Sequence, residues 1–120
     1  MLDHTIRLAG PWELTLADET SRQQLPCELS PGTTLSRAFH QPTGLDQGHR
    51  VRIQLELALS DVEIHLNDRS VEPIATQSNG NHCTVTLDVT EDLQKFNRLM
   101  ILCRAANNLL HSVSLEIHTN

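Results

Sequence analysis

Apolar and polar residues alternate along most of this chain, and the longest alternating stretch spans residues 49–59. A β-strand places successive side chains on opposite faces of a sheet, whereas a helix would scatter the same residues around its circumference. The stretch therefore predicts a strand with one buried and one solvated face. Its inward residues are expected to be Val51, Ile53, Leu55, Leu57 and Leu59.

Shorter stretches show the same period and predict further strands at residues 12–16, 62–66, 83–89 and 113–117. In the first of these, Trp12, Leu14 and Leu16 are expected to face the core. Residues 99–103 are apolar at every position, which predicts a central strand covered on both sides, or one whose outer face meets a loop or another chain. Two more short strands are expected at residues 5–8 and 37–39.

Turn-forming residues separate these segments, at residues 9–11, 30–32, 42–44, 67–69 and 78–81. Only residues 90–96 predict a helix, a single turn capped by Thr90 with Glu91 and Asp92 at its positive end. Together the pattern predicts an all-β fold, an antiparallel jelly-roll β-sandwich of about eight or nine strands. A length of 120 residues suits one domain, which we expect to span residues 1–120.

Charge and hydropathy narrow the class of partner. The formal net charge is −6 and the basic residues are scattered, so we expect no nucleic-acid binding. The longest purely apolar run, Leu99–Cys103, is far shorter than a membrane span, and the first residues lack the pattern of a signal peptide. The expected location is cytoplasmic, without membrane association.

The three cysteines, Cys27, Cys83 and Cys103, have neither an even count nor a C-x-x-C spacing. This argues against a disulfide framework or a zinc ribbon. Cys83 and Cys103 fall at apolar positions of strand patterns, so we expect small buried hydrophobes. Cys27 is expected in a loop, as an inert thiol.

Four segments, in this order and roughly this spacing, resemble the N-terminal sugar-binding domain of glycoside hydrolase family 2. They are Leu35–Pro42, Val62–Asp68, Leu87–Leu93 and Asn97–Ile101, and Gly10–Leu14 resembles the start of that domain. The resemblance implies a galactose-binding-like jelly roll and a carbohydrate ligand. The family's catalytic carboxylates lie in a separate barrel domain, so the resemblance implies no catalytic residue here, and we expect the chain not to be an enzyme.

The stretch between the second and third segments departs from the family. Members usually carry a Gly-Gly-Tyr-type stretch there, whereas residues 72–82 contain no aromatic residue and one glycine, Gly80. Sugar sites usually combine an aromatic platform with polar groups. Trp12 is expected in the core, so sugar contacts would be polar. The candidate ligand-binding residues lie on two loops: Asn79, Asn81 and His82 on one, and Asp46, Gln47 and His49 on the other.

Metal ligation is the next candidate chemistry. The seven histidines form no H-x-x-x-H or H-E-x-x-H spacing, so we expect no metal site and no cofactor. His65 and His118 are expected on outward strand faces, where they could meet across strands. Jelly rolls can also hold structural calcium through backbone carbonyls, which no sequence pattern marks.

Some apolar residues lie at positions that alternation does not assign inward, and they suggest a second possible function, protein interaction. These are Met100, Leu102, Leu109 and Leu110. Either they form an apolar sheet face for a protein partner or a homodimer, or a loop covers them. Two hypotheses therefore remain: a non-catalytic binding module for carbohydrate, or a structural or protein-interaction sandwich with no sugar site.

Overall fold

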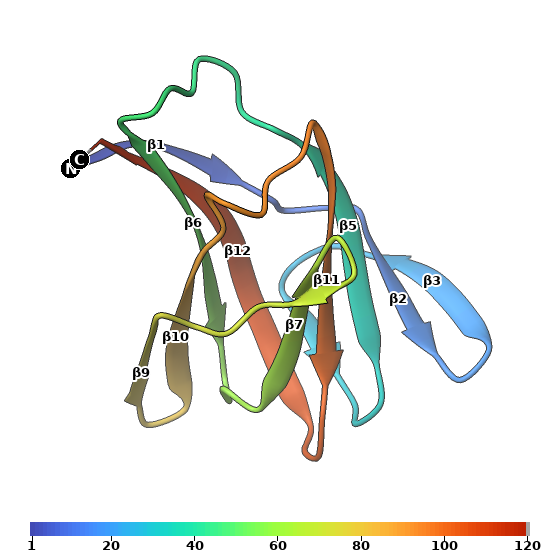
Figure 1. Cartoon of the computed structure of the whole chain (residues 1–120). Helices are drawn as coiled ribbons and strands as arrows, with labels where there is room; N and C mark the ends of the chain where they lie inside the picture. Colours follow the sequence, from blue (N-terminus) through green and yellow to red (C-terminus); the bar gives the residue numbers. More distant parts are fainter. Residues whose placement is uncertain (120) are drawn as a thin grey trace.

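The computed structural model describes residues 1–119, whose backbone forms two antiparallel sheets packed face to face (Figure 1). Sheet A has the strand order β1-β12-β6-β10-β9, and β4 also pairs with β12. Sheet B has the order β3-β2-β5-β11-β7-β8. The strands are β1 (Leu2–Arg7), β2 (Trp12–Leu16), β3 (Glu19–Gln23), β4 (Cys27–Leu29), β5 (Thr34–His40), β6 (His49–Leu57), β7 (Val62–Leu66), β8 (Arg69–Ser70), β9 (Ala75–Asn79), β10 (His82–Asp88), β11 (Phe96–Cys103) and β12 (Asn108–Thr119).

The core lies between the sheets and is built from the residues that alternation assigned inward. Along β6 every second residue from Val51 to Leu57 is buried, and β10 and β12 follow the same rule. Sheet B contributes Leu35, Leu99 and Ile101, each fully buried. Burying one such side chain stabilises the fold by about 1.5–3 kcal/mol. The predicted antiparallel sandwich is confirmed.

Two leucines predicted to face the core lie on the surface instead. Strand β6 ends at Leu57, so Leu59 lies in the following connection and is 40% exposed. Leu16 ends β2 beside the turn to β3 and is 43% exposed. In both cases the apolar residue continues the sequence pattern past the point where the other sheet covers the strand.

The predicted helix over residues 90–96 is wrong, because no residue of the described range 1–119 is helical. The segment makes one turn, in which the Val89 carbonyl accepts from the backbone N–H groups of Asp92 and Leu93. Thr90 does not cap a helix. Its hydroxyl oxygen accepts from the Val51 backbone N–H at 2.8 Å, which joins the turn to β6.

The apolar run at 99–103 belongs to β11, the strand between β5 and β7 in sheet B. Met100 and Leu102 point to its outer face and are half-buried. The four residues predicted as one apolar face are divided: Leu109 is half-buried in sheet A, and Leu110 is in the core at 1% exposure. A β-bulge between Leu110 and Ser112 shifts the register of β12, which turns Leu110 inward.

Hairpin turns were predicted better than edge strands. Asn67 and Asp68 both have positive φ (54° and 67°) and join β7 to β8, as expected for a two-residue hairpin loop. Strands β3, β4, β8 and β9 were not predicted. Four of the five residues of β3 and all five of β9 are exposed, so neither strand carries alternating apolar positions.

The cysteines are all buried and free. Cys27 begins β4 and is in the core, so its prediction as a loop residue is wrong. Burial raises the pKa of the Cys27 thiol, and Glu28 adds to the effect. Burial likewise raises the pKa of the Cys103 thiol, with a further contribution from Asp61.

His65 and His118, which could have met across strands, lie on different sheets. His65 lies on β7 of sheet B beside Glu63, and His118 lies on β12 of sheet A beside Glu116. No helix among the described residues is long and apolar enough to cross a membrane.

Candidate functional site

The two ends of the sandwich carry different polar groups. We call the end where β6 begins and β10 finishes the upper end, and the end where β10 and β12 begin the lower end (Figure 1). Because β6 and β10 are antiparallel, with Asp88 opposite Arg52 and Cys83 opposite Leu57, polar residues near the ends of these two strands can be assigned to the upper or the lower end.

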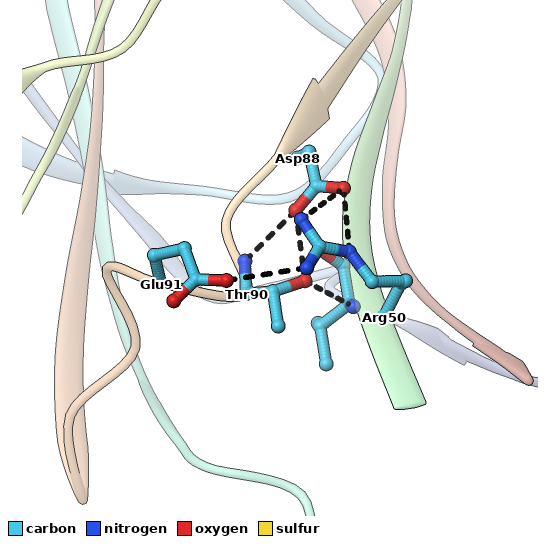
Figure 2. A network of polar contacts seen from close by, with 5 residues as sticks. Arg50, Asp88, Thr90 and Glu91 are labelled. Atoms are coloured by element: carbon cyan, nitrogen blue, oxygen red, sulfur yellow. Dashed lines mark hydrogen bonds and ion pairs between the residues drawn. The ribbon is translucent and has the colours of Figure 1, made fainter. Parts of the chain in front are cut away.

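A network of charged and polar groups lies at the upper end (Figure 2). Arg50 Nε and Nη2 lie 3.2 and 3.1 Å from Asp88 Oδ2, and Arg50 Nη1 lies 3.2 Å from Glu91 Oε1. The other carboxylate oxygen of Asp88 accepts from the Thr90 hydroxyl at 2.8 Å and the Thr90 backbone N–H at 3.1 Å. The Asp88 oxygens are thus engaged within the protein, which is typical of a structural clamp.

The pKa of Asp88 reflects this network. Burial opposes ionisation and would raise the pKa, but the hydrogen bonds from Thr90 and Arg50 together outweigh it. The pKa of Asp88 is therefore held below its usual value. The same contacts with Asp88, followed by those with Glu91, raise the pKa of the Arg50 guanidinium.

The predicted loop residues Asp46 and His49 also lie at the upper end, just before and at the start of β6. Their polar atoms face each other: Asp46 Oδ1 accepts from the Gly48 backbone N–H at 2.8 Å and lies 3.0 Å from His49 Nδ1. These contacts close the loop on itself. Their role in ligand binding stays a prediction.

The other predicted group, Asn79, Asn81 and His82, lies at the lower end. Asn79 and His82 are register partners across the β9–β10 turn, in which Gly80 has φ of 63°. Along β6 the two ends are eight residues apart, which corresponds to about 26 Å in a strand. The two predicted groups therefore do not form one site.

A surface hollow with a volume of about 550 Å³ lies at the lower end. Its lining includes Glu28, Ser30, Ala58, Asn107 and Leu109. Strand β4 brings Glu28 opposite Leu109, and the Ala58 backbone N–H donates to the Leu109 carbonyl at 2.9 Å. Three segments far apart in sequence thus meet in one row across sheet A.

The predicted His82 continues this row. Cys83 pairs with Leu57, so His82 lies opposite Ala58 by the same register, and Asn79 follows on β9. Because the core-facing residues of β10 are Cys83, Val85 and Leu87, His82 points to the outer face. The structure therefore places His82 beside Ala58, which lines the hollow, and Asn79 one strand farther from it.

A histidine pair and a carboxylate flank the hollow. The rings of His82 and His111 have centroids 5.7 Å apart, and His82 Nε2 lies 3.6 Å from Glu56 Oε1. The other oxygen of Glu56 accepts from the Ser112 hydroxyl at 2.8 Å. The bulge between Leu110 and Ser112 gives β12 the extra residue that brings His111 to this position.

The polar side chains that line the hollow differ in whether they already form hydrogen bonds within the protein. The Asn108 amide oxygen accepts from the Leu59 and Leu109 backbone N–H groups, and its nitrogen donates to the Leu59 carbonyl. In contrast, the side chains of Glu28 and Asn107 are exposed and make no hydrogen bond or ion pair with other residues in 1–119. Asn108 thus builds the wall, and Glu28 and Asn107 present free polar groups.

Sequence reasoning missed Glu28, Asn107 and His111. Their positions depend on the pairing of β4 with β12 and on a bulge, and neither leaves a local pattern in the sequence. The one sequence signal for this region was Leu109, an apolar residue at a position that alternation does not assign inward. It was interpreted as part of a contact surface or of a surface covered by a loop. Within residues 1–119 no group of three or more His, Cys, Asp or Glu side chains is arranged to hold a metal ion.

Comparison with known proteins shows what fold this chain shares with a solved structure. No family profile matches the sequence, and no curated protein matches it. Among solved structures, the FMN-binding beta-glucuronidase from Facaelibacterium prausnitzii L2-6 matches with a TM-score of 0.73 and 17% identity. The match covers 98% of this chain and 23% of the enzyme, so the chain spans less than a quarter of that protein's length. This chain therefore shares the fold of a β-domain found within a larger glycoside hydrolase.

Proposed function

We propose that this chain is a non-catalytic accessory β-sandwich domain that binds carbohydrate in the lower-end hollow. The observation that carries the proposal is the hollow itself: about 550 Å³, within the usual range of ligand sites, with Glu28 and Asn107 unengaged. A carboxylate and an amide are suited to paired sugar hydroxyls, and Leu109 and Ala58 offer apolar surface to the C–H face of a ring.

The neighbouring groups favour binding over hydrolysis. In a serine hydrolase the imidazole lies between the nucleophile and the carboxylate. Here Glu56 lies between Ser112 and His82, so the hydroxyl donates to the carboxylate and the imidazole is not its partner. The likeness to a domain that makes up less than a quarter of a glucuronidase also supports an accessory role.

The test is a glycan screen of the purified chain, followed by calorimetric titration of the best glycan against variants. Glu28→Gln removes the carboxylate charge and Asn107→Ala removes the side-chain amide. A lost hydrogen bond of about 1 kcal/mol corresponds to about a fivefold rise in Kd, which we expect for each variant. The matched control is Asp46→Ala, an exposed polar residue at the upper end, which should change Kd less than about twofold.

Two results would contradict this proposal. One is the absence of binding by any glycan at millimolar concentration. The other is loss of binding in Asp46→Ala or in Phe96→Ala while Asn107→Ala binds normally. Phe96 is the one exposed aromatic residue and lies at the upper end, so that result would move the site there.

The alternative function is a structural or protein-interaction domain without a sugar site. The observation in its favour is the burial of Trp12, which is 0% exposed, so no indole is present on the surface to stack on a sugar. Sedimentation equilibrium tests it directly. Self-association at micromolar concentration, together with a negative glycan screen, would favour this function over the first.

A further inference from the structure

A second surface hollow lies over sheet B, and arginine is its most frequent lining residue. Its volume is about 310 Å³, and its lining includes Glu13, Arg22, Ser36, Arg37 and Arg98. The chain contains eight arginines, so three of the eight line one small hollow.

Strand register explains how these residues meet. Glu13 on β2 lies opposite Arg22 on β3 and opposite Ser36 on β5, so the three share one row of the sheet. Arg98 on β11 pairs with Ala38 and reaches the same row. Trp12 is the buried inward residue of β2, so its neighbour Glu13 and that whole row face outward.

The charges in the hollow are unevenly compensated. Arg98 Nη1 donates to Ser36 Oγ at 2.9 Å and lies 3.8 Å from Glu13 Oε2. Arg22 and Arg37 form no ion pair with any residue of 1–119. Arg37 pairs with the buried Leu99 and therefore belongs to the inward-facing row of β5. On the outer face Arg22 and Arg98 stand against Glu13, which leaves a local charge of +1 in a chain whose formal net charge is −6.

We propose that this hollow is a binding site for a compact oxyanion group, such as a sulfate or phosphate. Guanidinium groups present planar forks of N–H donors that match the oxygens of these anions, often in bidentate fashion. Like charges gathered in a partly enclosed space repel one another, and an anion between Arg22 and Arg98 relieves that repulsion. The Ser36 hydroxyl supplies a further donor. The site is on the other sheet from the lower-end hollow and does not depend on the proposed carbohydrate site.

The test is titration of the full chain with sodium sulfate and sodium phosphate, with sodium chloride holding the ionic strength constant. Chemical shifts of the arginine side-chain N–H groups report binding. We expect saturable binding that Arg22→Gln weakens about tenfold or more, because one charge-assisted contact is lost. The matched control, Arg69→Gln, removes the same charge from an exposed residue outside the hollow and should change Kd less than about twofold.

Glu13→Gln gives a result of opposite sign. It removes the carboxylate that competes for Arg98, so we expect anion binding to strengthen about threefold or more. A gain of affinity cannot arise from misfolding, which keeps the proposal testable if Arg22→Gln unfolds. The proposal is overturned by shifts no larger than those with chloride, by equal effects of Arg22→Gln and Arg69→Gln, or by weaker binding in Glu13→Gln.

Two further ligands identify the source of the anion. The affinities of glucose 6-phosphate and of glucose are compared with that of inorganic phosphate. If glucose 6-phosphate binds about tenfold tighter than inorganic phosphate and glucose alone does not bind here, the ligand is an anion carried on a sugar. Equal affinity for glucose 6-phosphate and inorganic phosphate identifies the free inorganic ion as the ligand.

Discussion

Replacing Asn108 with alanine tests how the wall of the lower-end hollow is held. Asn108 is 6% exposed, and its amide forms hydrogen bonds of 2.9, 2.8 and 2.8 Å to the backbones of Leu59 and Leu109. The substitution leaves these backbone groups without their protein partner. Each net hydrogen bond contributes about 1 kcal/mol, and water can reach Leu59, which is 40% exposed. We therefore expect Asn108→Ala to lower the free energy of unfolding by about 2–3 kcal/mol.

The assay is urea unfolding followed by fluorescence. Trp12 is the only tryptophan and is fully buried, so its emission reports the loss of the core. In a domain of this size, about 2–3 kcal/mol corresponds to a fall in Tm of roughly 6–15 °C. The control is Asn107→Ala, an exposed neighbour, which should stay within about 0.5 kcal/mol of the parent. A change below about 0.5 kcal/mol in Asn108→Ala, or equal changes in the two variants, would refute this account.

Two further predictions concern titratable groups. The pKa of Asp88 is lower in the folded than in the unfolded chain, so the unfolded chain binds more protons in acid. Stability from this group is therefore complete above about pH 4 and is lost as the pH falls through the folded-state pKa. Urea unfolding at a series of pH values should show a smaller acid loss in Asp88→Asn, and an unchanged acid profile would contradict the clamp. Burial raises the thiol pKa of Cys27 and Cys103, so a thiol reagent at pH 8 should label them slowly in the native protein and rapidly in urea. Fast labelling of the native protein would mean that these thiols are not in the core.

Strands with one buried face were predictable from the sequence, because their alternation is a local property. Residues 49–57 match β6 throughout, and the pattern failed at Leu59 and at Leu16, where the apolar residues continue past the point that the other sheet covers. Edge strands were not predictable in this way. Strand β9 has five exposed residues, so its assignment depends on hydrogen bonds to β10 and not on its own composition.

The segment after β10 shows why local capping rules failed. Thr90 followed by two acidic residues is a helix start signal, but the Thr90 hydroxyl is engaged by Val51 and Asp88. Those partners are on β6 and at the end of β10, and sheet formation brings them to the turn. The tertiary hydrogen bonds replace the helix that the local sequence favours.

The candidate site was only partly predictable. His82 and Asn79 were chosen as polar residues at a loop tip, and the structure places His82 beside the lower-end hollow and Asn79 one strand farther from it. Glu28 and Asn107 join them only because β4 pairs with β12. Such non-local pairing cannot be inferred from one sequence, because residue spacing along the chain carries no information about it.

Mapping a bound glycan by two-dimensional NMR tests the proposed carbohydrate site most directly. The backbone amide shifts of the full chain would be followed as the best glycan from the screen is added. We predict that the largest shifts cluster at residues 28–30 and 107–111 around the lower-end hollow. Shifts confined to residues 46–49 and Phe96 at the upper end, or no shifts with any glycan, would contradict the proposal.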